Sequence, residues 1–282
     1  MLAACGGSEA GNQAEEATDN TAEVQQDVEF EAGTTMAELS EAGSITVGTK
    51  FDQPGFGLLN PDGVPEGFDV EVAKIIAAEL GIAAEDIEWV ETVSANREPF
   101  LQNGQVDMVV ATYTINDKRK EVIDFAGPYY VAGQDIMVAK GNPLAIEGPD
   151  DLAGKRVCSV EGSTPAQNIR DNYPEAQLTL FDVYSKCADA LRNGQVDAVT
   201  TDNVILTGLV QGGQGAFELV GNPFTQEPYG IGLTKGDDEF RGFINDTLEQ
   251  AFEDGSWAAA WDRTAGAITG EPAPEPPTID RY

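Results

Sequence analysis

A seven-residue segment occurs twice in this chain and constrains the fold more than any other sequence feature. LQNGQVD at residues 101–107 matches LRNGQVD at residues 191–197 in six of seven positions, 90 residues later. Each copy has the pattern of a helix end, a glycine turn and a buried strand, and polar residues follow each strand. Ligands of open α/β sheets collect beyond the carboxyl ends of the strands. The repeat therefore predicts two α/β lobes, each with one polar edge.

Composition limits the functions open to the chain. Its 282 residues carry a net charge of −33, and no basic patch suits a phosphate backbone, so we expect no nucleic-acid partner. The sequence has no apolar run of 18 or more residues, so no segment is expected to span a membrane. It has no histidine, which removes the commonest general base and the commonest transition-metal ligand. Its three cysteines form no CxxC pair, and we expect neither metal nor cofactor.

The first residues resemble a bacterial lipobox. Leu2-Ala3-Ala4 precede Cys5, which would be lipidated after a signal peptide is removed and would tether the chain to a membrane surface. A chance N-terminal cysteine is the alternative. Residues 8–32 are acidic and polar with one aromatic residue, so residues 1–32 are expected to be a lipobox followed by a disordered acidic linker.

The remaining pattern alternates strands and helices. Apolar residues at helical spacing predict a helix after Asp69, its expected N-cap, and a buried strand is expected over 106–111. A strand near 134–139 is expected to cross into the second lobe, where the order of elements repeats. We expect residues 33–133 plus 228–268 to form lobe one, 134–227 to form lobe two, and the Pro-rich residues 269–282 to be a disordered tail.

Cys158 and Cys187 lie in the same proposed lobe. In an exported protein they are expected to form a disulfide that closes a loop of about 30 residues, worth roughly 3–4 kcal/mol. Two buried free thiols are the alternative.

Several further segments occur together in a characteristic order. They are GFDV at 67–70, TINDKR at 114–119, DF at 124–125, PYY at 128–130, DLAGK at 151–155, EGST at 161–164, GQVDA at 194–198 and DGSW at 254–257. This set resembles the extracytoplasmic solute-binding proteins of polar amino-acid ABC importers, solute-binding protein family 3. The resemblance implies an α/β, two-lobe, periplasmic-binding-protein-like (type II) fold, in which two crossover strands form a hinge and the lobes close on a ligand.

The same resemblance implies a ligand site between the lobes. Arg119 would hold the ligand α-carboxylate, which suits a planar guanidinium, and Asp202 would accept from the α-ammonium. Further contacts would come from the Thr112 backbone, the Thr114 hydroxyl, Ser163, Thr164 and Tyr184. Some of these residues could instead have a purely structural role. Arg119 alone could be a surface charge, Asp202 a helix N-cap, and Tyr184 a packing residue.

The basic residues near the first-lobe edge indicate the ligand's side chain. Gln53 stands where relatives that take basic or neutral amino acids place an aromatic lid, and Phe51 or Phe56 could substitute for it. Lys50 and Arg97 would add two cations to Arg119, which implies a second carboxylate in the ligand. This pattern resembles the glutamate and aspartate binders of the family. Glutamine or a basic amino acid is the nearest alternative.

We therefore expect a monomeric, extracytoplasmic receptor, lipid-anchored to the outer face of the cell membrane. It would capture glutamate or aspartate by hinge closure and deliver it to an ABC permease and ATPase complex. A dehydratase or lyase on the same fold is a rival from another class, but it would need a carboxylate acid or base, and only Glu91 and Asp202 are candidates. The sensing module of a membrane receptor is a third candidate, disfavoured because this sequence lacks a transmembrane segment.

Overall fold

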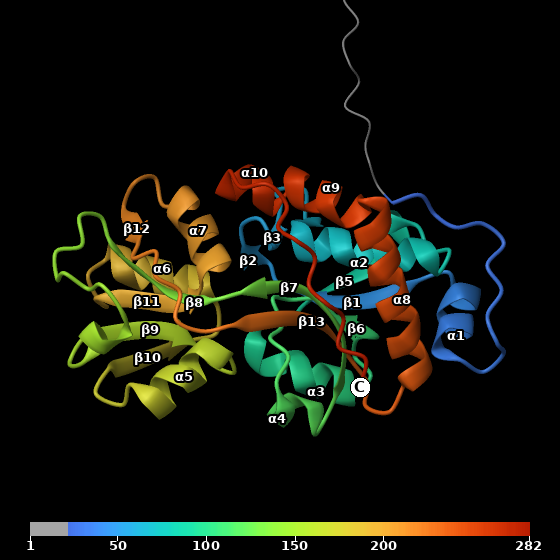
Figure 1. Cartoon of the computed structure of the whole chain (residues 1–282), viewed down its shortest axis with the longest axis horizontal. Coiled ribbons are helices and arrows are strands. Elements are labelled where there is room, and N and C mark those ends of the chain that lie inside the picture. Colours follow the sequence, from blue (N-terminus) through green and yellow to red (C-terminus); the bar gives the residue numbers. More distant parts are fainter. Residues whose placement is uncertain (1–21) are drawn as a thin grey trace, which may run out of the picture.

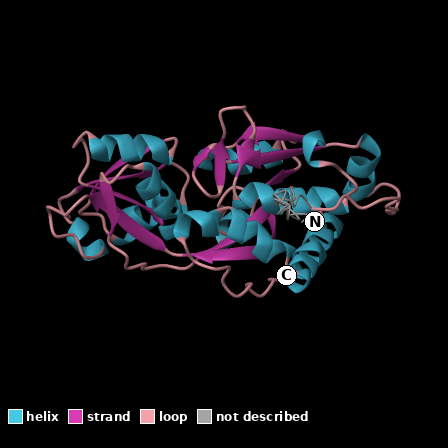
Figure 2. Ribbon diagram, turned by 90° about the horizontal axis from the view of Figure 1, so that it is seen from above, coloured by secondary structure: helices cyan, strands magenta, loops and turns pink. Residues whose placement is uncertain are grey.

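The computed structural model describes residues 22–282, which form two α/β lobes side by side (Figure 1). Each lobe has a five-stranded sheet, and Figure 2 shows both sheets with helices packed against them. The lipobox with Cys5 and most of the acidic linker lie outside the described residues. Within residues 22–282, no helix has the length and apolar character needed to cross a membrane.

Lobe one is built on a mixed sheet. Its strand order is β5 (Ile87–Glu91), β1 (Ile45–Thr49), β6 (Met108–Val109), β13 (Glu227–Leu233) and β7 (Asp124–Ala132). The helices that accompany it are α1 (Thr35–Ala42), α2 (Phe68–Glu79), α3 (Arg97–Gln102), α4 (Asp117–Lys120), α8 (Asp238–Asp254), α9 (Ser256–Arg263) and α10 (Ala265–Thr269), with short 3-10 turns at Ala84–Asp86 and Ser94–Asn96. A small sheet of β2 (Asp52–Gln53), β3 (Gly57–Leu59) and β4 (Pro65–Glu66) borders the cleft side.

Lobe two repeats this plan. Its strand order is β10 (Gln177–Phe181), β9 (Arg156–Val160), β11 (Ala198–Asp202), β8 (Gln134–Ala139) and β12 (Phe217–Leu219). Its helices are α5 (Thr164–Asn172), α6 (Tyr184–Arg192) and α7 (Asn203–Gly212), with a 3-10 turn at Pro149–Leu152. Alternate strand residues face opposite sides. Val157 accordingly packs with Ile169 of α5, whereas Cys158, the next residue, belongs to the core that includes α6 and α7.

Two strands connect the lobes. β7 continues through Gly133 into β8, and β13 returns beside β7 in an antiparallel ladder that begins at the pair Glu227 and Ala132 (Figure 1). A Cβ on Gly133 would lie 2.9 Å from both the Pro223 Cβ and the Thr225 carbonyl oxygen, so the crossing requires glycine here.

The proposed aromatic substitute for a lid is in the core of lobe one. Phe56 is 1% exposed and lies edge-on to Phe68, Tyr130 and Trp261, with ring centroids 5.9–6.3 Å apart. The expectation that Phe56 could cover a ligand is therefore wrong, because its side chain fills the core beneath α2 and α9.

The C-terminal residues also differ from expectation. Residues 270–282 have no regular secondary structure, but they lie against lobe one instead of being disordered. The Tyr282 hydroxyl accepts from the Phe125 backbone at 2.9 Å on the outer edge of β7, and its ring lies under Lys120. Arg281 pairs with Asp246 and Glu249 of α8. These side-chain anchors fix a Pro-rich segment whose backbone makes few hydrogen bonds of its own.

At the other end of the described residues, the Gln25 N–H donates to the Ala78 carbonyl of α2, so both described ends lie on lobe one.

Candidate functional site

Most of the predicted site residues surround one small cavity between the lobes. The members that line it are Arg97, Thr112, Thr114, Ser163, Thr164, Tyr184 and Asp202. Lobe one supplies the first three, from α3 and the loop after β6. Lobe two supplies the others, from the starts of α5 and α6 and the end of β11. Both repeats thus lead into the same space, as expected for loops beyond the ends of strands.

Lys50 and Arg119 stand next to this cavity but do not line it. Arg119 borders the larger opening at the mouth of the cleft instead. Lys50 lies at the end of β1, is 4% exposed, and donates from Nζ to the Ser94 hydroxyl at 2.9 Å. Ser94 does line the cavity, so one side chain separates Lys50 from it. Burial, followed by the charge of Arg97, lowers the pKa of Lys50 well below its usual value.

The two arginines are held by backbone carbonyls and by one aromatic ring. Arg119 donates to the Thr114 carbonyl at 2.6 Å and to the Glu98 carboxylate at 3.0 Å. Arg97 donates to the Ala111 and Thr112 carbonyls at 3.1 and 3.3 Å. The guanidinium carbons lie 4.1 Å (Arg97) and 4.9 Å (Arg119) from the centre of the Tyr113 ring.

Two buried cations so close together favour an anion between or beside them. Burial, and then the charge of Arg119, lowers the pKa of Arg97 to about 10. A carboxylate in the cavity would raise the pKa of Arg97 again and could accept hydrogen bonds from its guanidinium.

Asp69, expected to cap α2, holds the threonine loop. The N-cap of α2 is Gly67, because the Asp69 side chain turns inward, accepting from the Thr112 N–H at 2.8 Å and the Tyr129 hydroxyl at 2.6 Å. Thr112 has φ +44°, rare for a β-branched residue, and these contacts keep it there. Burial raises the pKa of Asp69 to about 7, although both hydrogen bonds act against that rise.

Asp202 is the acidic side of the cavity. It occupies the N-cap position of α7, but its side chain makes no capping bond. Oδ2 accepts from the Tyr229 hydroxyl at 2.6 Å, and Oδ1 is buried without a hydrogen-bond partner in the described part of the chain. Burial, then the charge of Glu227, raises the pKa of Asp202 to about 8. The free oxygen is available to a cationic group in the cavity.

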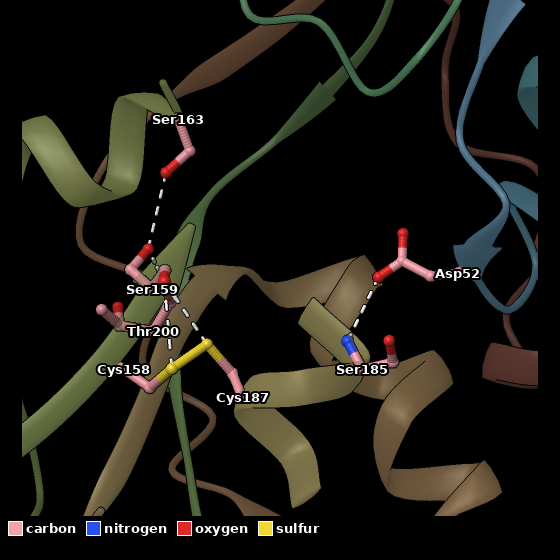
Figure 3. Close-up of a disulfide and its surroundings, with 7 residues drawn as sticks. All are labelled: Asp52, Cys158, Ser159, Ser163, Ser185, Cys187 and Thr200. Carbon is pink, nitrogen blue, oxygen red and sulfur yellow. Dashed lines mark hydrogen bonds between the residues drawn. A yellow bond between two sulfur atoms is a disulfide. The ribbon is translucent and has the colours of Figure 1, made fainter. Parts of the chain in front are cut away.

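In this structure the lobes are in contact across the cleft. Arg119 donates to the Thr164 hydroxyl and the Gly162 carbonyl, both at 3.0 Å. From the other side, the Ser185 N–H of α6 donates to the Asp52 carboxylate of β2 at 3.1 Å (Figure 3). Gly162 has φ +77°, and a Cβ there would lie 2.7 Å from the Ala95 Cα. The lobes therefore meet with backbone nearly touching backbone.

The expected disulfide is present in lobe two. Cys158 of β9 and Cys187 of α6 are bonded with Cα atoms 5.6 Å apart (Figure 3). The adjacent Ser159 donates to the Thr200 carbonyl at 2.9 Å and lies 3.5 Å from the Ser163 hydroxyl, which caps α5 by accepting from Ala166. The bridge thus fixes α6 beside the strands that end at the cavity.

Sequence reasoning missed some residues of the site. Ser94, Thr201 and Ile205 line the cavity, and Glu227 is a buried carboxylate close to Asp202. Ser94 precedes Arg97 by three residues and could have been named from that spacing. Glu227 belongs to no motif, because its position near Asp202 depends on the register of the returning strand β13. No group of three or more His, Cys, Asp or Glu side chains suited to a metal ion occurs between residues 22 and 282.

Comparison with known proteins relates the chain to one family of binding proteins. The model for bacterial extracellular solute-binding proteins, family 3, matches residues 45–266. Glutamate-binding protein GluB of Corynebacterium glutamicum is 48% identical over 77% of each chain, and GluB of Corynebacterium efficiens is 46% identical over 80% of each. The glutamine-binding protein GlnH of Bacillus subtilis is 41% identical over 79% of this chain and 81% of its own.

Solved structures show the same fold. The solute receptor for L-cysteine of Neisseria gonorrhoeae superposes with a TM-score of 0.79 at 30% identity, over 84% of this chain and 96% of that one. An ancestral arginine-binding protein, solved with arginine and also with glutamine, gives a TM-score of 0.74 at 36% identity over 79% of this chain and 97–98% of its own.

Proposed function

This chain belongs to family 3 of the bacterial extracellular solute-binding proteins, and from that premise we propose that it captures glutamate for an ABC importer. As a solute-binding protein it is extracytoplasmic, and it is a receptor and not an enzyme. The observation that carries the choice of ligand class is the distribution of charge around the cavity. Arginines of lobe one stand opposite the free oxygen of Asp202 in lobe two.

Each charged group then takes one part of an acidic amino acid. Arg119, with Thr114 and the Ser163-Thr164 turn, would bind the α-carboxylate, and Asp202 would accept from the α-ammonium. Arg97 would bind the side-chain carboxylate with help from the Thr112 backbone, Tyr184 and Lys50, the last acting through Ser94. Both named corynebacterial relatives are glutamate-binding proteins, which supports glutamate over aspartate.

The mechanism would be closure of a hinge formed by β7 and β13. Ligand would first bind to lobe one, and lobe two would then close over it and bring Asp202 and Thr164 into place. The closed form would dock on the permease of the importer. Such closure suits the contacts that Arg119 and Asp52 make across the cleft.

Thermal unfolding with separate amino acids tests this proposal. We expect glutamate at about 100 times its dissociation constant to stabilise the protein by roughly 2.7 kcal/mol, with aspartate weaker at equal concentration. Isothermal titration gives the affinities. Stabilisation by arginine or histidine alone would contradict an acidic ligand.

Glutamine is the second candidate, and two observations favour it. GlnH is 41% identical to this chain. In addition, Ser94 separates Lys50 from the cavity, so the charge of Lys50 does not directly meet a side-chain carboxylate there. Tighter binding of glutamine than of glutamate in the same titration would decide for it.

We also propose that Cys5 carries a lipid anchor. Leu2-Ala3-Ala4-Cys5 matches the lipobox pattern, and an extracytoplasmic receptor gains from a tether near its permease. Expression with a full signal peptide in a bacterium should place the protein in the membrane fraction, and Cys5→Ser should release it. Equal partition of both forms would contradict the anchor.

A further inference from the structure

Glu227 is a buried carboxylate that no motif assigns. It is 2% exposed at the start of β13, the strand that returns from lobe two. Oε1 accepts from the Thr225 hydroxyl at 2.8 Å, whereas Oε2 is buried and has no hydrogen-bond partner within residues 22–282. A buried carboxylate with a free oxygen is costly unless something pairs with it.

The strand geometry directs Glu227 toward Asp202. Side chains two apart in a strand lie on the same face, so Glu227 and Tyr229 share a face of β13. The ladder with β7 keeps its register from Glu227 to Tyr229, and the Tyr229 hydroxyl donates to Asp202 Oδ2 at 2.6 Å. Thr114, which lines the cavity, pairs with Tyr229 in an isolated bridge. Glu227 does not itself line the cavity, but it shares a strand face with Tyr229, which contacts Asp202 and pairs with Thr114 of the cavity wall.

The charges agree with this placement. Burial raises the pKa of Glu227, and the hydroxyls of Thr114 and Thr225 act against that rise. The negative charge of Glu227 also contributes to the raised pKa of Asp202. Two neighbouring carboxylates, each with one free buried oxygen, are an unfavourable pair that a single cation would relieve.

We infer that Glu227 is a second acceptor for the α-ammonium group of the ligand, beside Asp202. An ammonium group has three N–H donors, more than Asp202 Oδ1 can satisfy alone. Glu227 would make the receptor select ligands with a free α-amino group, and it would do so from the start of β13, where the chain crosses between the lobes. This inference rests on the proposed function, because it assigns a further contact to the same ligand.

The test compares glutamate with glutarate, which has both carboxylates but no ammonium group. Wild-type protein and Glu227→Gln are titrated with each by calorimetry. We expect Glu227→Gln to lose roughly tenfold to a hundredfold in glutamate affinity and to bind glutarate no worse than wild type does. The glutamate-to-glutarate preference should therefore fall. A structural role would weaken both ligands by the same factor, and that outcome, or an unchanged preference, would overturn the inference.

Glu71→Gln is the matched control. Glu71 is 9% exposed in α2, and its carboxylate is paired with Lys74 and Arg263, neither of which lines the cavity. Glu71→Gln should have a lower melting temperature than wild type and the same glutamate-to-glutarate preference. Wild-type protein that binds no glutamate would refute the proposed ligand and not this inference. The comparison would then use the amino acid that does bind and its deaminated analogue.

Discussion

Lys50 is expected to affect both the stability and the ligand specificity of the protein. Its ammonium group is buried against Ser94, and burial lowers its pKa well below the usual value. Removing the charge with Lys50→Met should raise the melting temperature of the ligand-free protein, because a buried cation without a carboxylate partner is unfavourable.

The same substitution should weaken glutamate binding about tenfold and leave glutamine binding nearly unchanged, since only glutamate has a second negative charge. Titration of both amino acids checks this result. Lys140→Met, which removes an exposed lysine of lobe two, is the control and should change neither affinity. Equal losses for glutamate and glutamine would contradict the role given to Lys50.

Asp202 should make the ligand-free protein less stable as the pH rises. Its pKa is raised from the ordinary 3.8 to about 8, so between these values the folded state binds more protons than the unfolded state does. Stability then falls with increasing pH across that window. Asp69, with a pKa raised to about 7, acts with the same sign.

We therefore expect a lower melting temperature at about pH 8 than at about pH 5, and a smaller difference in Asp202→Asn. The variant keeps part of the slope, because Asp69 still titrates. Scanning calorimetry without ligand measures both proteins. An identical slope in the two would show that Asp202 is not held in a desolvated environment.

Residues that follow motifs were easier to predict than residues that depend on register. Arg97, Thr112 and Asp202 were named from the sequence, and the structure puts all three around one cavity. Each follows a strand or begins a helix, so local pattern is enough to place it at a sheet edge. Glu227 gives no such local signal, because its position depends on how β13 pairs with β7.

At the scale of elements, α6 is capped by the opposite lobe. Its N-cap position is Val183, which supplies no side-chain bond, and the Ser185 N–H donates to Asp52 of lobe one instead. Asp52→Ala should therefore destabilise mainly the closed state. The loss of a cap costs about 1 kcal/mol, so we expect roughly a fivefold weaker glutamate affinity, mostly through faster dissociation.

Asp237→Ala is the matched control for this cap. Asp237 caps α8 by accepting from Phe240 at 3.0 Å, entirely within lobe one. It should lower the melting temperature without changing ligand affinity, as measured by stopped-flow and calorimetry. If Asp52→Ala behaves like Asp237→Ala, the contact across the cleft does not contribute to closure.

Elements were well predicted where their apolar pattern is long. The helix expected near Asp69 from its apolar spacing is α2, which spans Phe68–Glu79. The strand expected over 106–111 is regular only at Met108–Val109, because the chain turns away at Thr112 to form the threonine loop beside the cavity. The tail was missed since its order depends on single anchors such as Tyr282 and Arg281.

At the scale of the whole molecule, the contact between the lobes requires a glycine in α7. A Cβ on Gly208 would lie 2.4 Å from the Pro54 carbonyl oxygen of lobe one. Gly208→Ala should stabilise lobe two by up to about 1 kcal/mol, because alanine is the better helix former. It should also weaken ligand binding, because the methyl group holds the lobes apart.

Gly212→Ala in the same helix is the control, since a Cβ there meets nothing within 4 Å. It should leave the affinity as in wild type. Small-angle scattering with saturating glutamate should give a larger radius of gyration for Gly208→Ala than for wild type or Gly212→Ala. Wild-type affinity and compactness in Gly208→Ala would show that the lobes do not approach this closely with ligand bound.

The two-lobe architecture could be predicted because the repeat and the crossing strand at 134–139 are sequence features. The contact between the lobes could not be predicted from the sequence, because it depends on surfaces that meet only after both lobes have formed. Gly162, Asp52 and Gly208 have ordinary sequence surroundings, and only the structure shows that they meet Ala95, Ser185 and Pro54.

Both described ends of the chain rest on lobe one, through Gln25 and Tyr282. If the lobes close as proposed, a tether on either side of the described residues would therefore act on lobe one and not on lobe two. A surface or a fusion partner joined there would hold lobe one and leave lobe two free to move during the proposed closure. A fluorescent dye placed on the outer side of lobe two should show the same change in signal on ligand binding whether the protein is free in solution or immobilised.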